Sequence, residues 1–173
     1  MDFTFRVAAP NDFSSLMQLM NLTKSIVHPT EWFVCETEES LSSMISEHGF
    51  VIIAQPENPS DSNEVAGMFA IKFPGMTPDN LGRYQNFSDE QLELCAHMES
   101  TIVHPQYRGY HLQAQMAQRA EELLKKLPYK YLFATIHPDN QYSMNNMILC
   151  GYRPVAQEKL YGGLDRIIVL KEI

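Results

Sequence analysis

Residues 103–113 read VHPQYRGYHLQ, a segment in which an extended run gives way to a helix. Val103 closes an alternating run that predicts a strand, Gly109 lies in the turn, and Leu112 opens an amphipathic stripe. The first amides of a helix lack intrahelical acceptors and lie at the positive end of its dipole. A pyrophosphate group can therefore accept several hydrogen bonds at such a turn, and Arg108 would add positive charge.

Hydrophobic spacing on either side of this segment predicts alternating strands and helices, without internal repeats. Caps and breakers support the helices: Thr37, a Ser88/Gln91 capping box and Asn140 each precede one, and Gly49 is placed to end the second. The order is α+β. Strands are expected at residues 3–8, 50–54, 64–73, 96–103, 131–136, 153–160 and 164–170, with a turn-rich loop at 55–63; helices are expected to begin near residues 13, 38, 89, 112 and 141.

The pattern V-x-P-x-Y-R-G at residues 103–109 resembles the acetyl-CoA motif of the GNAT superfamily of N-acetyltransferases, and it falls on the fourth expected strand. The fuller family motif is R-G-x-G-x-G/A. His111 and Gln113 stand where a glycine and a small residue are usual. We expect the backbone amides to bind all the same, because the start of a helix does not require a positive φ, with both side chains turned away from the phosphates.

Two further segments carry the resemblance, which spans most of the chain. Residues 135–140, followed by Gly151 and Tyr152, resemble the family's fifth strand, its asparagine and its "GF" ending. Asn140 is accordingly expected to contact the pantetheine arm, to cap the next helix, or both. Residues 6–12 and the helix after them resemble the family's opening strand and helix, while the hairpin with Tyr161 and Arg166 looks like one bacterial branch.

The resemblance implies an α+β, three-layer fold in one domain over residues 1–173. Its mixed, mostly antiparallel twisted sheet would have six to seven strands, flanked by four to five helices. The implied acyl donor is acetyl-CoA. The residues expected to contact it are Thr101, Ile102, Val103, Arg108, Gly109, Tyr110, His111, Leu112, Gln113, Asn140 and Ser143.

Acyl transfer to an amine needs a base, because an alkyl amine with a pKa of about 10.4 is protonated at neutral pH. The period of two predicts that His97, Glu99, Thr101 and Val103 share one face of their strand. In the resembled family a carboxylate on this strand commonly serves as the base, so Glu99 is the first candidate and His97 the second. The alternative is that both side chains lie on a solvated face.

The general acid is less clearly indicated. The position of the family's usual tyrosine is Met147, which cannot donate a proton. Either the thiolate leaves unaided, since a thiol pKa is about 8.5, or Tyr142, Ser143 or Cys150 takes the role. Tyr142 is the first of these candidates.

Composition excludes several other classes. The net charge of -8 over 173 residues argues against nucleic acid as a partner. Three scattered cysteines without a CxxC pair are typical of a reduced, cytoplasmic protein, and no leader-like or membrane-spanning run is found. His104, His111 and His137 match no metal-ligand spacing, so no metal is expected. A homodimer is compatible with the sequence.

The function predicted is transfer of an acetyl group from acetyl-CoA to a primary amine of a small molecule or peptide, by direct attack in a ternary complex. The alternative is a catalytically silent acyl-CoA-binding sensor or regulatory module. The irregular segments 29–33 and 74–87, with Trp32, Tyr84 and Phe87, are expected to shape the amine pocket. The sequence does not identify the amine.

Overall fold

The computed structural model describes residues 1–59 and 64–173, so the end of the expected 55–63 loop lies outside the described residues. Seven strands form one sheet in the order β1-β2-β3-β4-β5-β7-β6. The strands are β1 (Phe3–Val7), β2 (Gly49–Pro56), β3 (Gly67–Lys72), β4 (Cys95–Val103), β5 (Tyr131–Ile136), β6 (Arg153–Leu160) and β7 (Leu164–Glu172). The α-helices are α1 (Phe13–Ile26), α2 (Glu38–Ser46), α3 (Asp89–Leu92), α4 (Leu112–Leu124) and α5 (Gln141–Leu149). Short 3-10 turns are η1 (Pro10–Asp12), η2 (Thr30–Trp32), η3 (Leu81–Gln85) and η4 (Pro105–Tyr107).

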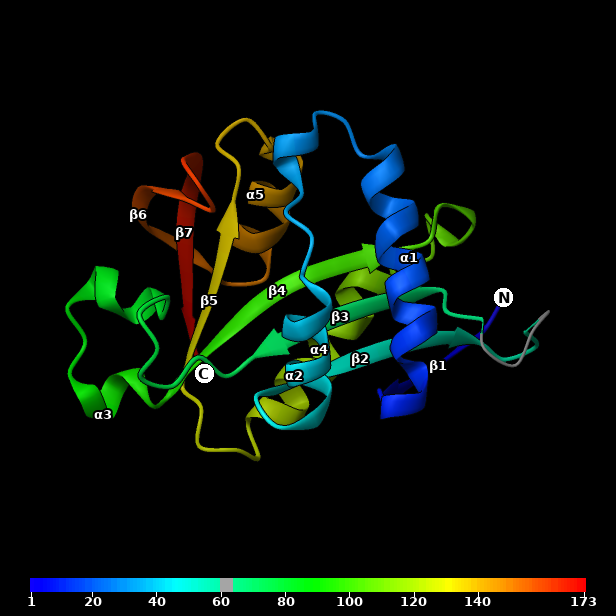
Figure 1. Cartoon of the computed structure of the whole chain (residues 1–173), viewed down its shortest axis with the longest axis horizontal. Coiled ribbons are helices and arrows are strands. Elements are labelled where there is room, and N and C mark those ends of the chain that lie inside the picture. Colours follow the sequence, from blue (N-terminus) through cyan, green and yellow to red (C-terminus); the bar gives the residue numbers. More distant parts are fainter. Residues whose placement is uncertain (60–63) are drawn as a thin grey trace.

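All neighbouring strands are antiparallel except β4 and β5, which run parallel. Helices α1 and α2 cover one face of the sheet, and α4 and α5 cover the other (Figure 1). This arrangement confirms the expected mixed, mostly antiparallel sheet between two helical layers.

Each face of the sheet has its own core. On the α1 and α2 face, Leu16 and Leu41 pack against Val51 and Ile53 of β2. The opposite face packs against α4 and α5 through the alternate residues of the same strands. That second core includes Ile52, Phe69, Met98, Met116, Ala120, Leu124, Leu132 and Met144.

The helix starts follow the expected caps. The Thr37 hydroxyl accepts from Ser40 N, and Ser88 and Gln91 form a reciprocal capping box at α3. The expectation for Gly49 is wrong: α2 ends at Ser46, and Gly49 opens β2 instead. A side chain there would collide with the Ile71 carbonyl of β3, so the close approach of two strands explains this glycine.

Strand β4 contains a bulge. Ile71 of β3 lies opposite Met98, whereas Phe69 lies opposite Thr101, so β4 has one residue more than its partner between these pairs. Met98 belongs to the core under α4, while Ile102 belongs to the core under α1 and α2. The extra residue therefore reverses which side chains face each helical layer.

The bulge overturns the expectation that four alternate residues of β4 share one face. Val103 packs on the α4 side with Met98, whereas His97 contacts Phe133 on the opposite side. Strict alternation fails because the bulge inserts one residue into the strand. His97 and Glu99 thus share a face from which Val103 is excluded.

Strands β4 and β5 separate after a short contact. They pair only from Cys95–His97 to Tyr131–Phe133. Beyond that point β5 continues to pair with β7, and β4 with β3, so the facing edges of β4 and β5 are unpaired in the described chain. Figure 1 shows the two strands diverging toward α5. We call this opening, between residues 98–103 and 134–136, the wedge.

Candidate active site

The turn before α4 presents a row of free backbone donors. Within the described chain, the amide N–H groups of residues 109–114 have no protein acceptor, and the first bond of the helix runs from Gln115 N to His111 O at 3.2 Å. Tyr107 anchors the turn: its ring is buried in the core, and its hydroxyl donates to the Glu64 carboxylate. This row of donors at the positive end of the helix dipole is suited to an anion.

Two residues of this turn have left-handed backbone conformations. Gly109 has a φ of 87° and His111 a φ of 58°. The expectation that no positive φ is needed is therefore wrong at His111, the position where the family motif has a glycine. A Cβ at Gly109 would meet nothing within 4 Å, so the backbone angle, rather than space, requires glycine there.

The expected cofactor residues divide into side chains that can reach a ligand and side chains that cannot. Ile102 and Leu112 are buried in the two cores, so only their backbone groups are available. The exposed side chains of the turn are Arg108, Tyr110, His111 and Gln113. Tyr110 lies edge-on to Phe3 of β1, with ring centroids 5.3 Å apart.

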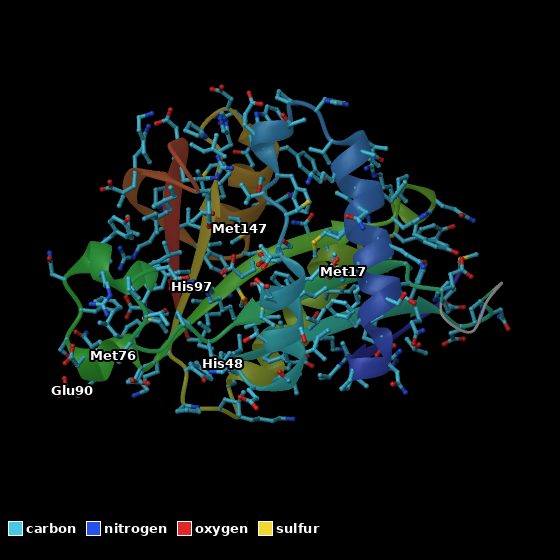
Figure 2. The ribbon with its side chains drawn as sticks, in the orientation of Figure 1. Met17, His48, Met76, Glu90, His97 and Met147 are labelled. Atoms are coloured by element: carbon cyan, nitrogen blue, oxygen red, sulfur yellow. The ribbon has the colours of Figure 1, made fainter. Side chains whose placement is uncertain are left out.

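At the start of α5, the Asn140 side-chain oxygen accepts from Ser143 N at 3.0 Å. The capping role expected for Asn140 is thus present. Met147 of α5 is partly buried and packs against the core (Figure 2). Tyr142 is 77 % exposed and its hydroxyl makes no hydrogen bond within the described residues, so its role as general acid stays a prediction.

On the α1 and α2 face, β4 carries two polar side chains beside the narrow end of the wedge. The His97 side chain is only 4 % exposed and that of Glu99 is 19 % exposed, with His97 Nδ1 lying 3.4 Å from Glu99 Oε1. His97 Nε2 accepts a hydrogen bond from Leu81 N of η3 at 3.1 Å. The alternative that both residues lie on a solvated face is excluded for His97.

A second carboxylate, missed by sequence reasoning, faces the same region. Glu36, just before α2, accepts from Ser40 Oγ at 2.7 Å and from Ser100 Oγ of the bulge at 3.4 Å. Burial raises the pKa of Glu36, and the negative charge of Glu99 raises it further. The segment before α2 has no periodicity that could have indicated this contact.

The β6–β7 hairpin completes the surroundings of Glu99. The Tyr161 hydroxyl lies 3.0 Å from Thr135 Oγ1 at the end of β5, and burial, together with the charge of Glu99, raises the pKa of Tyr161 to about 12. Arg166 is 2 % exposed and donates to the carbonyls of Glu31 (2.6 Å) and Asp165 (2.8 Å). Arg166 thus ties β7 to η2.

The aromatic residues expected as pocket walls have different environments. Trp32 of η2 lies 6.4 Å from His137 at the end of β5, measured between ring centroids, which places it over the wedge. Phe87 packs against the core with its ring 4.6 Å from that of Tyr131, and Tyr84 is exposed. Phe87 therefore supports the fold beneath the site rather than an open pocket.

Other possible sites lie elsewhere or are not found. Two surface hollows of about 580 and 560 Å³ lie beside α2 and beside the β1–β2 edge, away from the wedge. The described ranges contain no group of three His, Cys, Asp or Glu side chains that could hold a metal ion. Among the helices described, none has the length and apolar composition of a membrane span.

Known proteins share this fold. Solved structures with the same fold include NAA60 of Arabidopsis thaliana with acetyl-CoA (TM-score 0.78, 13 % identity, 99 % of both chains covered). They also include the NatC complex bound to Gag peptide and CoA (TM-score 0.74, 11 % identity, covering 100 % of this chain and 99 % of that one). A third is the ribosomal-protein-S18-alanine N-acetyltransferase of Escherichia coli (TM-score 0.70, 14 % identity, covering 99 % of this chain and 94 % of that one).

No curated protein gives a significant sequence match. The model of the acetyltransferase (GNAT) family matches residues 13–152, which is most of the chain. That match runs from the start of α1, through the β4 bulge and the α4 turn, to Tyr152 just after α5. The chain therefore belongs to the GNAT family of acetyltransferases.

Proposed function

We propose that this protein transfers the acetyl group of acetyl-CoA to a primary amine of a small molecule or peptide, by direct attack in a ternary complex. The observation that carries the proposal is the wedge between β4 and β5. One end of β4 leads into the free amides of residues 109–114, and Glu99 lies farther back along the strand. In this proposal, residues 1–173 form a single acetyltransferase domain.

The donor groups of the chain fit coenzyme A. A diphosphate needs several convergent N–H donors and positive charge, which residues 109–114 and the exposed Arg108 provide. The two amides of a pantetheine arm need an unpaired strand edge, which Thr101 to Val103 of β4 provides, with Asn140 and Ser143 across the wedge. Acetyl-CoA would supply a thioester whose acyl carbon accepts a nucleophile.

The acceptor amine would approach from the face that carries Glu99 and Glu36. Their negative charges favour the ammonium form, which must lose a proton before it can attack. In our scheme Glu99 accepts that proton as the general base. The amine nitrogen then forms a bond to the acyl carbon, the carbon–sulfur bond breaks, and coenzyme A leaves as the thiolate or thiol.

Segments distant in the sequence meet at this face. Glu36 and Tyr161 lie close enough to Glu99 for their charges to interact, and Trp32 of η2 lies beside His137 at the end of β5. Peptide amines are included among the candidate acceptors because the related NatC structure contains a peptide. The exposed Tyr142 is kept as a candidate acid, and unaided departure of the thiolate as its alternative.

A catalytically silent acyl-CoA-binding module is the second candidate, favoured by one observation. Met147, in place of the family's tyrosine, packs into the core and offers no proton to a leaving thiolate. Such a module would bind coenzyme A at the α4 turn without accelerating transfer to any amine.

The two candidates differ in turnover. Calorimetry should first establish acetyl-CoA binding, and thiol release should then be followed with polyamines, aminoglycosides, amino acids and peptides. An acceptor that raises thiol release in the wild type but not in Glu99→Gln supports the enzyme. Binding without any acceptor-dependent release would support the silent module, and absence of binding would contradict both.

A further inference from the structure

His97 lies directly behind the proposed base and is held from both sides. Its ring nitrogens face different partners: Nε2 accepts from Leu81 N at 3.1 Å, and Nδ1 lies 3.4 Å from Glu99 Oε1. Phe133 flanks the ring, with centroids 6.3 Å apart. The imidazole is therefore buried between the backbone of η3 and the carboxylate of Glu99.

The backbone donor determines which tautomer the ring adopts. A neutral imidazole has one nitrogen with a proton and one with a lone pair. Because Leu81 N–H points at Nε2, the lone pair must be there and the proton must be on Nδ1, facing Glu99. A proton on Nε2 would point at the N–H of Leu81, and the two positively polarised hydrogens would repel each other.

Leu81 cannot easily turn away, because η3 is fixed around it. Its own side chain is buried with Cys95 and Phe133. The neighbouring Asn80, fully buried, accepts from Gly82 N at 2.9 Å and donates to the carbonyls of Gly75 and Leu92. The donor to His97 is thus part of a rigid turn.

We propose that His97 is a positioning residue for Glu99 and not a second base. Its Nδ1–H orients Glu99 toward the amine, while its proton stays on the ring throughout the reaction. The inference rests on the proposed function, in which Glu99 takes the proton of the amine. Among the described residues, the other ionisable groups near this pair are the carboxylate of Glu36 before α2, the neutral phenol of Tyr161 after β6, and the ammonium of Lys72 of β3, which is paired with Asp79.

Two substitutions by neutral amides test the roles of the two ring nitrogens separately. The amide of Gln reaches the place of Nε2, so His97→Gln can still accept from Leu81 N–H but offers Glu99 no donor. The amide of Asn reaches only the place of Nδ1, so His97→Asn can still donate to Glu99 but leaves Leu81 N–H without an acceptor. Thermal unfolding shows whether each variant is folded before kinetics are compared.

We expect His97→Gln to unfold near the wild-type temperature but to lose about tenfold or more in kcat, because it removes the only His97 N–H donor near the Glu99 carboxylate. KM for the amine should change little. We expect His97→Asn to unfold at a lower temperature while keeping a clearly higher kcat than His97→Gln. Equal loss of kcat in both variants, as expected if His97 were a base, would overturn the proposal.

The tautomer of His97 can be measured without any turnover. Long-range ¹H–¹⁵N correlation spectra of the wild type at pH 7 should show His97 protonated at Nδ1 and unprotonated at Nε2. A ring protonated at Nε2, or at both nitrogens, would overturn the proposal even in an active enzyme. The expected spectrum without any amine turnover would instead remove the proposed function and leave the geometry of His97 established.

Discussion

The hydroxyl of Ser100 donates to the carboxylate of Glu36 across 3.4 Å, joining the segment before α2 to the bulge of β4. These residues are 64 positions apart in the sequence. Because Ser100 follows Glu99, the contact brings two carboxylates to the same face, beside the place where an amine would be acetylated. The bulge thus shapes both the wedge and the charge around it.

Glu36→Gln should change the pH dependence of stability. The pKa of Glu36 is raised in the folded protein, so its ionisation opposes folding once the pH exceeds the usual Glu pKa of about 4.3. The variant should therefore gain stability relative to the wild type as the pH rises above about 4.3. Urea unfolding at several pH values tests this, with the exposed Glu39→Gln as control; a difference that does not grow with pH would contradict it.

Glu99→Gln should lower kcat/KM for the best amine by about 100-fold or more, the usual contribution of a general base. Acetyl-CoA affinity should stay within about threefold, because the carboxylate faces the acceptor side. Steady-state kinetics and calorimetry measure the two effects. Glu158→Gln, which removes an exposed carboxylate of β6, should leave both unchanged. A Glu99 variant that retained wild-type turnover would require another base.

Gly109→Ala and His111→Gly should change stability in opposite directions. Alanine at position 109 should lower the free energy of unfolding by about 1 to 2 kcal/mol. The cost comes from holding a residue with a Cβ at a φ of 87°, because the Cβ itself contacts no neighbouring atom. A glycine at His111, where φ is 58°, should relieve strain and raise it by up to about 1 kcal/mol. Denaturant unfolding measures both, and destabilisation by His111→Gly would show that its side chain has an unrecognised partner.

Arg166→Lys should weaken the connection between β7 and η2. A lysine cannot reproduce a guanidinium that donates to two carbonyls, so we expect a loss of about 2 kcal/mol of stability. KM for the amine should rise more than KM for acetyl-CoA, because η2 lies over the acceptor side. Arg153→Lys, at an exposed ion pair, is the control. Equal increases in KM for the amine and KM for acetyl-CoA would show that Arg166 does not act on the acceptor side alone.

Local features of the sequence predicted much of this fold. The caps at Thr37, Ser88 and Asn140 and the turn before α4 depend on residues a few positions apart, so their chemistry is readable from the sequence. The membership of the GNAT family was likewise indicated by residues 103–109, and it is confirmed by the family match.

Features set by distant contacts could not be predicted. The bulge depends on how β4 registers with β3, and period-two spacing assigned Val103 to the wrong face because one inserted residue is invisible in a single strand. The tie from Arg166 to Glu31 spans 135 positions. The positive φ of His111 was missed because a histidine gives no sign of the conformation that a glycine would have indicated.

If the free amides before α4 bind the diphosphate of coenzyme A, a titration of ¹⁵N-labelled protein with CoA should show it directly. The amide signals of residues 109–114 should shift most, in step with the binding isotherm, while those of the hollow beside α2 should not move. If the signals of these six amides do not shift at saturating CoA, the nucleotide binds elsewhere and the turn before α4 is not the diphosphate site.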